Sequence, residues 1–183
     1  MTIAPTPVKV VVAGGFGVGK TTFVGSISDI VPLTTEAALT TASAATDHTG
    51  EGTDKTTTTV ALDFGRVALG DDLVLYLFGV PGQPRFQFLW PDLSRGAIGA
   101  VVLVDTRNIE DSFASIDWFE HARMPFVIGV NCFDGGSIYT AADVREALAV
   151  RDDVAIIMCD ARDRDSTKRT LIELVQQALA VSR

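Results

Sequence analysis

A glycine-rich segment near the N-terminus constrains the fold of this chain more than any other feature. Eight consecutive residues fit the pattern G-x-x-x-x-G-K-[ST], and they are Gly14, Gly15, Phe16, Gly17, Val18, Gly19, Lys20 and Thr21. A short β-branched run over residues 8–13 precedes the pattern, and a helical pattern over residues 20–28 follows it. Because a phosphate-binding loop (P-loop) requires a strand before it and a helix after it, an ordinary glycine-rich turn is the weaker interpretation.

The residue types of this segment suit a chain of phosphate groups. Glycines let backbone amides approach the phosphates closely, and the helix N-terminus adds partial positive charge. We expect Lys20 to bridge the β- and γ-phosphates and to act in catalysis, and Thr21 to bind Mg²⁺ through its hydroxyl group. Thr22 is a further candidate for the α-phosphate. The motif alone does not separate ATP from GTP.

The order of the other elements predicts an α/β fold. Strand-like runs at residues 59–67 and 73–78 flank the turn Gly70-Asp71-Asp72, which predicts an antiparallel hairpin. Later strands are expected at 98–104, 126–130 and 154–158, and helices at 110–120, 141–149 and 166–181. Ser166 is the expected N-cap of the last helix. Strands that alternate with helices predict a mainly parallel sheet between two helical layers, in one domain over residues 1–183.

A long connection separates the first helix from this hairpin. Residues 30–55 are rich in Thr, Ala, Ser, Asp and Gly, and their hydrophobic periodicity is weak. This composition predicts a loop, and loops of such length within compact domains are usually functional.

Composition excludes several classes of function. The chain has a formal net charge of −8, a pI of about 4.6 and no block rich in Lys or Arg, so a nucleic-acid partner is not expected. No apolar run reaches the roughly 18 residues of a membrane span, and no lipid-attachment motif occurs at either end. Two cysteines, Cys132 and Cys159, provide no disulfide framework. We therefore expect a cytoplasmic location, with membrane contact only through a protein partner.

Two segments at the ends of predicted strands bear on the choice of base. Asn131-Cys132-Phe133-Asp134 follows one strand, and Cys159-Asp160-Ala161-Arg162 follows another. Ligands of open α/β sheets lie at the carboxyl ends of the strands, where the P-loop also lies. A carboxylate there can accept hydrogen bonds from guanine N1–H and from the exocyclic amine, whereas adenine N1 is itself an acceptor. Asp134 is therefore the candidate selector of guanine.

These segments carry a family resemblance over nearly the whole chain. The P-loop, Gly82-Gln83 and the two segments at the strand ends resemble the nucleotide motifs of the Ras superfamily. The tract Leu77-Phe78-Gly79-Val80-Pro81-Gly82-Gln83-Pro84-Arg85-Phe86 resembles more closely the MglA-like GTPases of actinobacterial conservons. The resemblance implies a G-domain fold with a mixed, mostly parallel six-stranded sheet, and GTP or GDP with Mg²⁺ as ligands. It also implies a Roadblock/LC7-type protein and components of a sensor-kinase system as partners.

The resemblance also implies roles for individual residues around the base and the γ-phosphate. Asn131 would tie the base pocket to the P-loop, and the Ala161 amide would meet guanine O6. Arg162 would stack on the base, because its guanidinium is flat. Gln83, which follows Gly82 at the γ-phosphate, would orient the attacking water as a catalytic residue.

One further residue is implied by its spacing from Asp63. Thr59 lies four residues before Asp63, where related GTPases place the threonine that reaches Mg²⁺. Because residues 56–59 are all threonine, the register is open and Thr58 is the alternative.

Two departures from the family pattern affect the expected mechanism. Gly79 occupies the position of the aspartate that holds a Mg²⁺-bound water, and either Asp105 or Asp63 could replace it. The missing carboxylate predicts a weaker Mg²⁺ dependence. Cys132 occupies the position of a lysine whose stem covers one face of the purine, which predicts a lower nucleotide affinity.

Three functions are compatible with these motifs, and we rank them in order. The first is a slowly hydrolysing GTPase switch whose loops at residues 30–58 and 79–95 are ordered by GTP and Mg²⁺. The second is a pseudo-GTPase scaffold that binds guanine nucleotide with little turnover, which Gly79 and Cys132 would favour. The third is a P-loop ATPase or kinase, which Asp134 disfavours.

Overall fold

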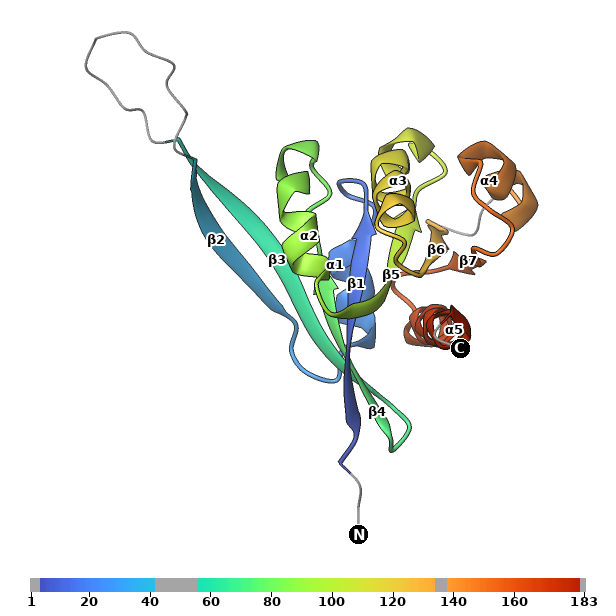
Figure 1. Ribbon diagram of the computed structural model, residues 1–183, viewed down its shortest axis with the longest axis horizontal. Coiled ribbons are helices and arrows are strands. Elements are labelled where there is room, and N and C mark those ends of the chain that lie inside the picture. The colour runs from blue at the N-terminus through green and yellow to red at the C-terminus, as the bar shows by residue number, and fades with distance from the viewer. Residues whose placement is uncertain (1–3, 42–55, 134–137, 182–183) are drawn as a thin grey trace, which may run out of the picture.

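The computed structural model describes residues 4–41, 56–133 and 138–181. Within them, one sheet contains seven strands in the order β2-β3-β4-β1-β5-β6-β7 (Figure 1). The strands are β1 (Thr6–Gly14), β2 (Leu33–Thr41), β3 (Thr56–Leu69), β4 (Leu73–Gly79), β5 (Ala97–Val104), β6 (Phe126–Asn131) and β7 (Ile156–Cys159). The predicted mixed, mostly parallel α/β sheet is confirmed, with seven strands instead of the six expected.

The additional strand is β2, and the prediction of one loop over residues 30–55 is wrong at Leu33–Thr41. β2 pairs antiparallel with β3, with Ala38 opposite Thr59, and forms the edge of the sheet. An edge strand made largely of threonine and alanine needs no alternation of large apolar residues, and so it carries no clear period-two signal. Threonine nevertheless favours strands because its branched Cβ fits the pleated backbone.

Five strands form the parallel part of the sheet. β4, β1, β5, β6 and β7 are parallel neighbours, whereas β3 pairs antiparallel with β4 as the predicted hairpin. Every residue of β6 is buried, which is typical of a parallel strand covered on both faces. The carboxyl ends of these five strands meet at one edge of the sheet, and the segments that carry the predicted motifs follow β1, β4, β6 and β7 there.

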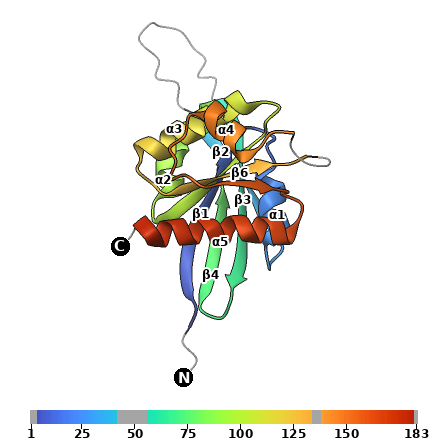
Figure 2. The same cartoon turned by 90° about the vertical axis from the view of Figure 1, so that its right-hand side faces the viewer.

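Helices cover both faces of the sheet. They are α1 (Lys20–Ile27), η1 (Pro84–Leu89), α2 (Trp90–Ser94), η2 (Ile109–Ser112), α3 (Phe113–His121), α4 (Ala141–Leu148) and α5 (Arg164–Val181), where η denotes a 3₁₀ helix. α1 and α5 lie on one face, and α2, α3 and α4 lie on the other (Figure 2). No helix among the described residues is both long enough and apolar enough to cross a membrane.

Two buried clusters hold these layers together. Phe23 and Ile27 of α1 share the first cluster with Leu171 and Leu174 of α5 and with one face of the sheet. The second cluster joins the opposite face to α2, α3 and α4 through Trp90, Phe119, Val144 and neighbouring apolar residues. Burial of a side chain of this size contributes about 1.5–3 kcal/mol.

The last helix begins two residues earlier than predicted. The Asp163 carboxylate accepts a hydrogen bond from the Ser166 N–H (2.7 Å), and the Asp163 carbonyl accepts one from the Thr167 N–H (3.0 Å). Asp163 is therefore the N-cap, and the expectation for Ser166 is wrong. The Ser166 hydroxyl instead accepts a hydrogen bond from the Asp160 N–H (3.0 Å), so it braces the segment between β7 and α5.

This cap generates a prediction about stability. We expect Asp163→Ala to lower the free energy of unfolding by about 1 kcal/mol, because the substitution leaves a helix N–H without its acceptor. Asp163→Asn is the matched control, since its side-chain oxygen can still accept that hydrogen bond. Urea unfolding of both variants measures the difference, and equal stabilities would exclude Asp163 as the cap.

Candidate functional site

The P-loop joins β1 to α1 and has the backbone geometry that its glycines permit. Gly19 has a φ of 105°, in the left-handed region that side chains disfavour, and it directly precedes α1. A Cβ atom at Gly19 would lie 2.7 Å from the Asn131 side-chain nitrogen. The glycine therefore permits both the turn and the close approach of β6.

Lys20 folds back over this loop. Its Nζ atom donates hydrogen bonds to the carbonyl oxygens of Gly14 (3.0 Å) and Gly15 (2.6 Å). Burial lowers the pKa of Lys20 to about 8, and the negative charge of Asp63 partly opposes this shift. Gly82 lies against the same amine, since a Cβ atom there would be 2.7 Å from Nζ. The amine is thus held at the centre of the site in a poorly solvated environment.

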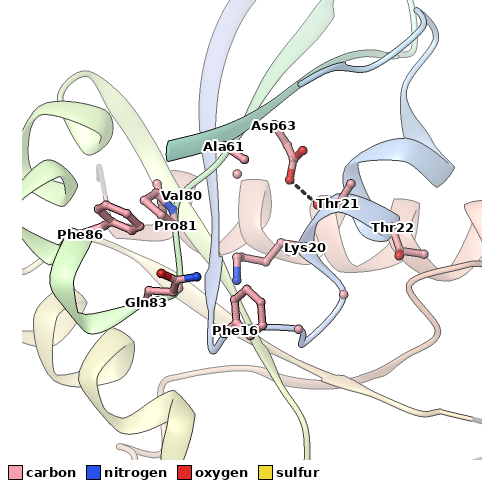
Figure 3. A pocket seen from close by; sticks show the side chains of 14 residues that line it. Phe16, Lys20, Thr21, Thr22, Ala61, Asp63, Val80, Pro81, Gln83 and Phe86 are labelled. Carbon is pink, nitrogen blue, oxygen red and sulfur yellow. Dashed lines mark hydrogen bonds between the residues drawn. The ribbon is translucent and has the colours of Figure 1, made fainter. Parts of the chain in front are cut away.

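Thr21 is paired with a carboxylate from the neighbouring part of the sheet. Its hydroxyl group donates a hydrogen bond to Asp63 Oδ2 (2.6 Å), as Figure 3 shows. The Thr34 hydroxyl donates to the other carboxylate oxygen (3.1 Å). Hydroxyl and carboxylate oxygens are the donors that Mg²⁺ prefers, so this pair of residues fits a magnesium ion.

The register of the β3–β4 hairpin explains how Asp63 reaches this position. Asp63 lies directly opposite Gly79, the residue that replaces the expected aspartate. A Cβ atom at Gly79 would be 3.0 Å from the Asp63 Cβ, so the glycine leaves room for the neighbouring carboxylate. Asp105, the other alternative, instead forms an ion pair with Arg107 (2.8 Å), which lowers its pKa.

A pocket of about 410 Å³ brings these groups together (Figure 3). Its lining comes from the P-loop and α1, from β3, and from the segment after β4. It includes Phe16, Gly17, Gly19, Lys20, Thr21, Thr22, Asp63, Gly82, Gln83 and Phe86. Most of the predicted phosphate-binding residues thus share one cavity with the predicted catalytic residue Gln83, whereas Gly14, Gly15 and Val18 are not part of its lining. Thr59 lies in β3 opposite Ala38, four residues before Asp63.

The loops at the ends of β1, β6 and β7 are joined by Asn131. This side chain is 6% exposed and donates from Nδ2 to the Val18 carbonyl of the P-loop (2.9 Å). Its Oδ1 atom accepts a hydrogen bond from the Ala161 N–H (3.1 Å). The Cys132 N–H also donates to the Cys159 carbonyl (2.7 Å). Asn131 therefore has the contact with the P-loop that the family resemblance implies.

Of the other predicted base-pocket residues, Ala161 and Arg162 have hydrogen-bond partners within the protein. The Ala161 N–H is bonded to Asn131, so contact with guanine O6 requires this hydrogen bond to be shared or exchanged. The Arg162 guanidinium is paired with the Asp160 carboxylate (3.0 Å) at the same strand end. Asp134, the predicted base selector, lies outside the described residues.

Sequence reasoning missed Thr34 because it falls within the predicted loop. It left Asp63 as one of two alternatives, since a hairpin register cannot be read from composition. One feature of the sequence distinguishes Asp63: it is an acidic residue within a strand that is otherwise largely apolar or threonine. Together, the amide-rich loop, the lysine and the Thr21–Asp63 pair can bind a phosphate chain with its divalent cation.

Comparisons with solved structures identify the fold. The cytosolic domain of the FeoB iron transporter of T. maritima, in a GDP form, matches 96% of this chain with a TM-score of 0.67 and 15% identity. This chain spans 65% of the length of that domain. The FeoB G-domain of Methanococcus jannaschii matches with a TM-score of 0.63 and 11% identity, over 94% of this chain and 98% of that domain. At such identities the likeness shows the fold alone, which is that of a P-loop G-domain.

Comparisons of sequence identify the family. An uncharacterized protein of Methanocaldococcus jannaschii is 29% identical over 136 residues, which cover 73% of this chain and 75% of that protein. The model of the family described as "Conserved hypothetical ATP binding protein" matches residues 12–181. That match spans the P-loop, all of the helices and almost the whole sheet. The chain is thus a P-loop nucleotide-binding protein with a G-domain fold, and it belongs to the family of conserved hypothetical ATP binding proteins.

Proposed function

We propose that this protein is a small GTP-binding switch that binds GTP or GDP with Mg²⁺ and slowly hydrolyses GTP. The observation that carries the proposal is the single pocket that joins Lys20, the Thr21–Asp63 pair and Gln83. Lys20 supplies a positive charge beside the P-loop carbonyls, and Gln83 supplies an amide that can orient a water. Intrinsic hydrolysis by such a site is expected to be slow, because in related GTPases a partner arginine accelerates the reaction by orders of magnitude.

Selection of guanine over adenine needs its own support, because the family description refers to ATP. Asp134 in the segment after β6, and the G-domain fold shared with a transporter domain in a GDP form, support guanine. A carboxylate facing adenine N1 would bring two acceptors together and leave both unpaired. An unsatisfied buried charged group costs more than the 1–3 kcal/mol of a neutral one.

In this proposal Asp63 takes over the role of the carboxylate that Gly79 lacks. The hydrogen bond of 2.6 Å between Thr21 and Asp63 brings the two oxygen donors to one point at the start of α1. A magnesium ion bound there would hold the β- and γ-phosphate oxygens and offset their charge. If Asp63 supplies this carboxylate, the weaker Mg²⁺ dependence expected from Gly79 should appear only when Asp63 is substituted. Thr59 is retained as a candidate ligand from β3.

We propose a cytoplasmic switch that signals through nucleotide-dependent partner binding. A Roadblock/LC7-type protein and sensor-kinase components are the partners that the resemblance to MglA-like GTPases favours, with membrane contact only through them and no nucleic acid. The alternative is a pseudo-GTPase scaffold that binds guanine nucleotide with little turnover. Cys132, which replaces a purine-covering lysine, favours that alternative.

Competition binding tests the choice of base. We expect GTP and GDP, but not ATP, to displace a fluorescent guanine nucleotide from the nucleotide-free protein with Mg²⁺. Asp134→Ala should weaken GTP binding at least about tenfold, as expected for loss of hydrogen bonds to a charged group, and leave ATP binding unchanged. Equal competition by ATP would contradict guanine selection, and absence of binding would contradict the proposal as a whole.

Substitution of the two acidic alternatives tests the magnesium site. We expect Asp63→Asn to raise the Mg²⁺ concentration required for half-maximal GTP binding by about tenfold or more, because a carboxamide is a poorer ligand or anchor for the ion. Asp105→Asn is the matched control, since Asp105 is paired with Arg107 outside the phosphate pocket. A larger effect of Asp105→Asn than of Asp63→Asn would reverse the assignment.

The lowered pKa of Lys20 predicts proton uptake on nucleotide binding. Free protein loses the Lys20 proton as the pH rises through about 8, whereas bound phosphates favour the charged amine and raise its pKa. Binding at pH 8–9 should therefore take up about half a proton or more, and affinity should fall as the pH rises further. Calorimetry in buffers of different ionisation enthalpy measures the uptake. Lys20→Arg should abolish it, since guanidinium does not titrate in this range, and equal uptake by both proteins would exclude Lys20 as its source.

A further inference from the structure

A short turn after β4 presents Gln83 and Arg85 next to the phosphate pocket. Gln83 is the residue before η1, with an extended backbone (φ −77°, ψ 134°), and Pro84 begins the 3₁₀ helix. The Phe86 N–H donates a hydrogen bond to the Gln83 carbonyl (3.0 Å), which closes the turn. Proline fixes its own φ and favours an extended conformation in the residue before it. The backbone that carries Gln83 is therefore well defined.

The side chain of Arg85 contacts that of Gln83. Arg85 Nε donates a hydrogen bond to Gln83 Oε1 (2.8 Å). The same guanidinium lies over the ring of Phe86, 4.7 Å from its centroid. Phe86 is 5% exposed and forms part of the pocket wall, so it gives the guanidinium a fixed surface. Arg85 is thus held between a packed ring and the carboxamide.

This contact determines which way the carboxamide faces. Arginine has five N–H donors and no acceptor, so the atom that bonds to Arg85 must be the oxygen of Gln83. The nitrogen of the carboxamide then lies on the side of Lys20, as Figure 3 shows. In this orientation the amide N–H₂ can donate to a γ-phosphate oxygen. The oxygen retains a second lone pair that can accept a hydrogen from water.

Arg66 and Arg95 have different environments from that of Arg85. Arg95 forms an ion pair with Asp92 (2.9 Å), and both side chains are largely exposed. Arg66 lies in β3, where its backbone N–H donates to the Ser28 hydroxyl (3.2 Å) after the end of α1. Neither contact involves Gln83.

We propose that Arg85 is a positioning residue that fixes the orientation of the Gln83 carboxamide for GTP hydrolysis. It acts on the reaction through Gln83 and not by direct contact with the phosphates. The inference rests on the proposed GTPase function. An arginine that acted directly on the phosphate would accelerate the reaction even without Gln83, and this difference makes the proposal testable.

A double-mutant cycle on single-turnover GTP hydrolysis tests this role. We expect Arg85→Ala to slow hydrolysis about tenfold, as misplacement of a catalytic group does, with GDP affinity within about twofold of wild type. In a Gln83→Ala background, Arg85→Ala should cause no further loss, because the group that it positions is absent. Arg95→Ala is the matched control and should hydrolyse GTP at the wild-type rate.

Several results would overturn the inference. Unchanged or faster hydrolysis by Arg85→Ala would exclude positioning, and a full tenfold loss in the Gln83→Ala background would indicate direct action on the phosphate. Wild-type binding and turnover are measured first, so that failure of the proposed function can be told apart from failure of this inference. Normal wild-type hydrolysis with an unaffected Arg85→Ala variant contradicts this inference alone. Wild-type protein that fails to bind or to hydrolyse GTP contradicts the proposed function and the inference together.

Discussion

The buried side chain of Asn131 holds together the three loops from which the site is built. It donates to the P-loop at Val18 and accepts from the segment after β7 at Ala161, so both of its polar atoms are used. A buried amide satisfied in this way fixes the relative positions of its partners, because the loss of either bond leaves a polar group unpaired. The same contact explains Gly19, since any side chain there would collide with the amide. The P-loop glycine thus serves the packing of the site as well as phosphate access.

A second constraint is the register of the β3–β4 hairpin. Asp63 reaches Thr21 because it lies opposite Gly79, where the strand has no side chain to block it. A shift of one residue would turn Asp63 to the other face of the sheet. The motif that this tract resembles carries its carboxylate at the position of Gly79, the last residue of β4, whereas here the carboxylate beside Thr21 comes from the adjacent strand β3. A glycine at position 79 is therefore compatible with a site that still has a carboxylate able to bind Mg²⁺.

The sequence predicted those parts of the structure whose causes are local. The P-loop, the hairpin and the buried parallel strands follow from residue type and spacing over a few positions. β2 was missed because its sequence is mostly threonine and alanine and shows no alternation of large apolar residues. Ser166 was chosen as N-cap although Asp163, three residues earlier, has the same capping chemistry, and residue type alone does not separate the two. The choice between Asp63 and Asp105 depended on pairing between strands, which no local pattern encodes.

The hydrogen bonds around Asp63 also connect the proposed metal site to the edge of the sheet. One carboxylate oxygen accepts from Thr21 at the start of α1, and the other accepts from Thr34 in β2. A magnesium ion bound to these oxygens would change the hydrogen bonds that Thr21 and Thr34 donate to Asp63. β2 is the edge strand and pairs only with β3. Its position therefore depends mainly on that pairing. In the proposed switch, a ligand bound at Asp63 would therefore be connected to the edge strand through the carboxylate that Thr21 and Thr34 share.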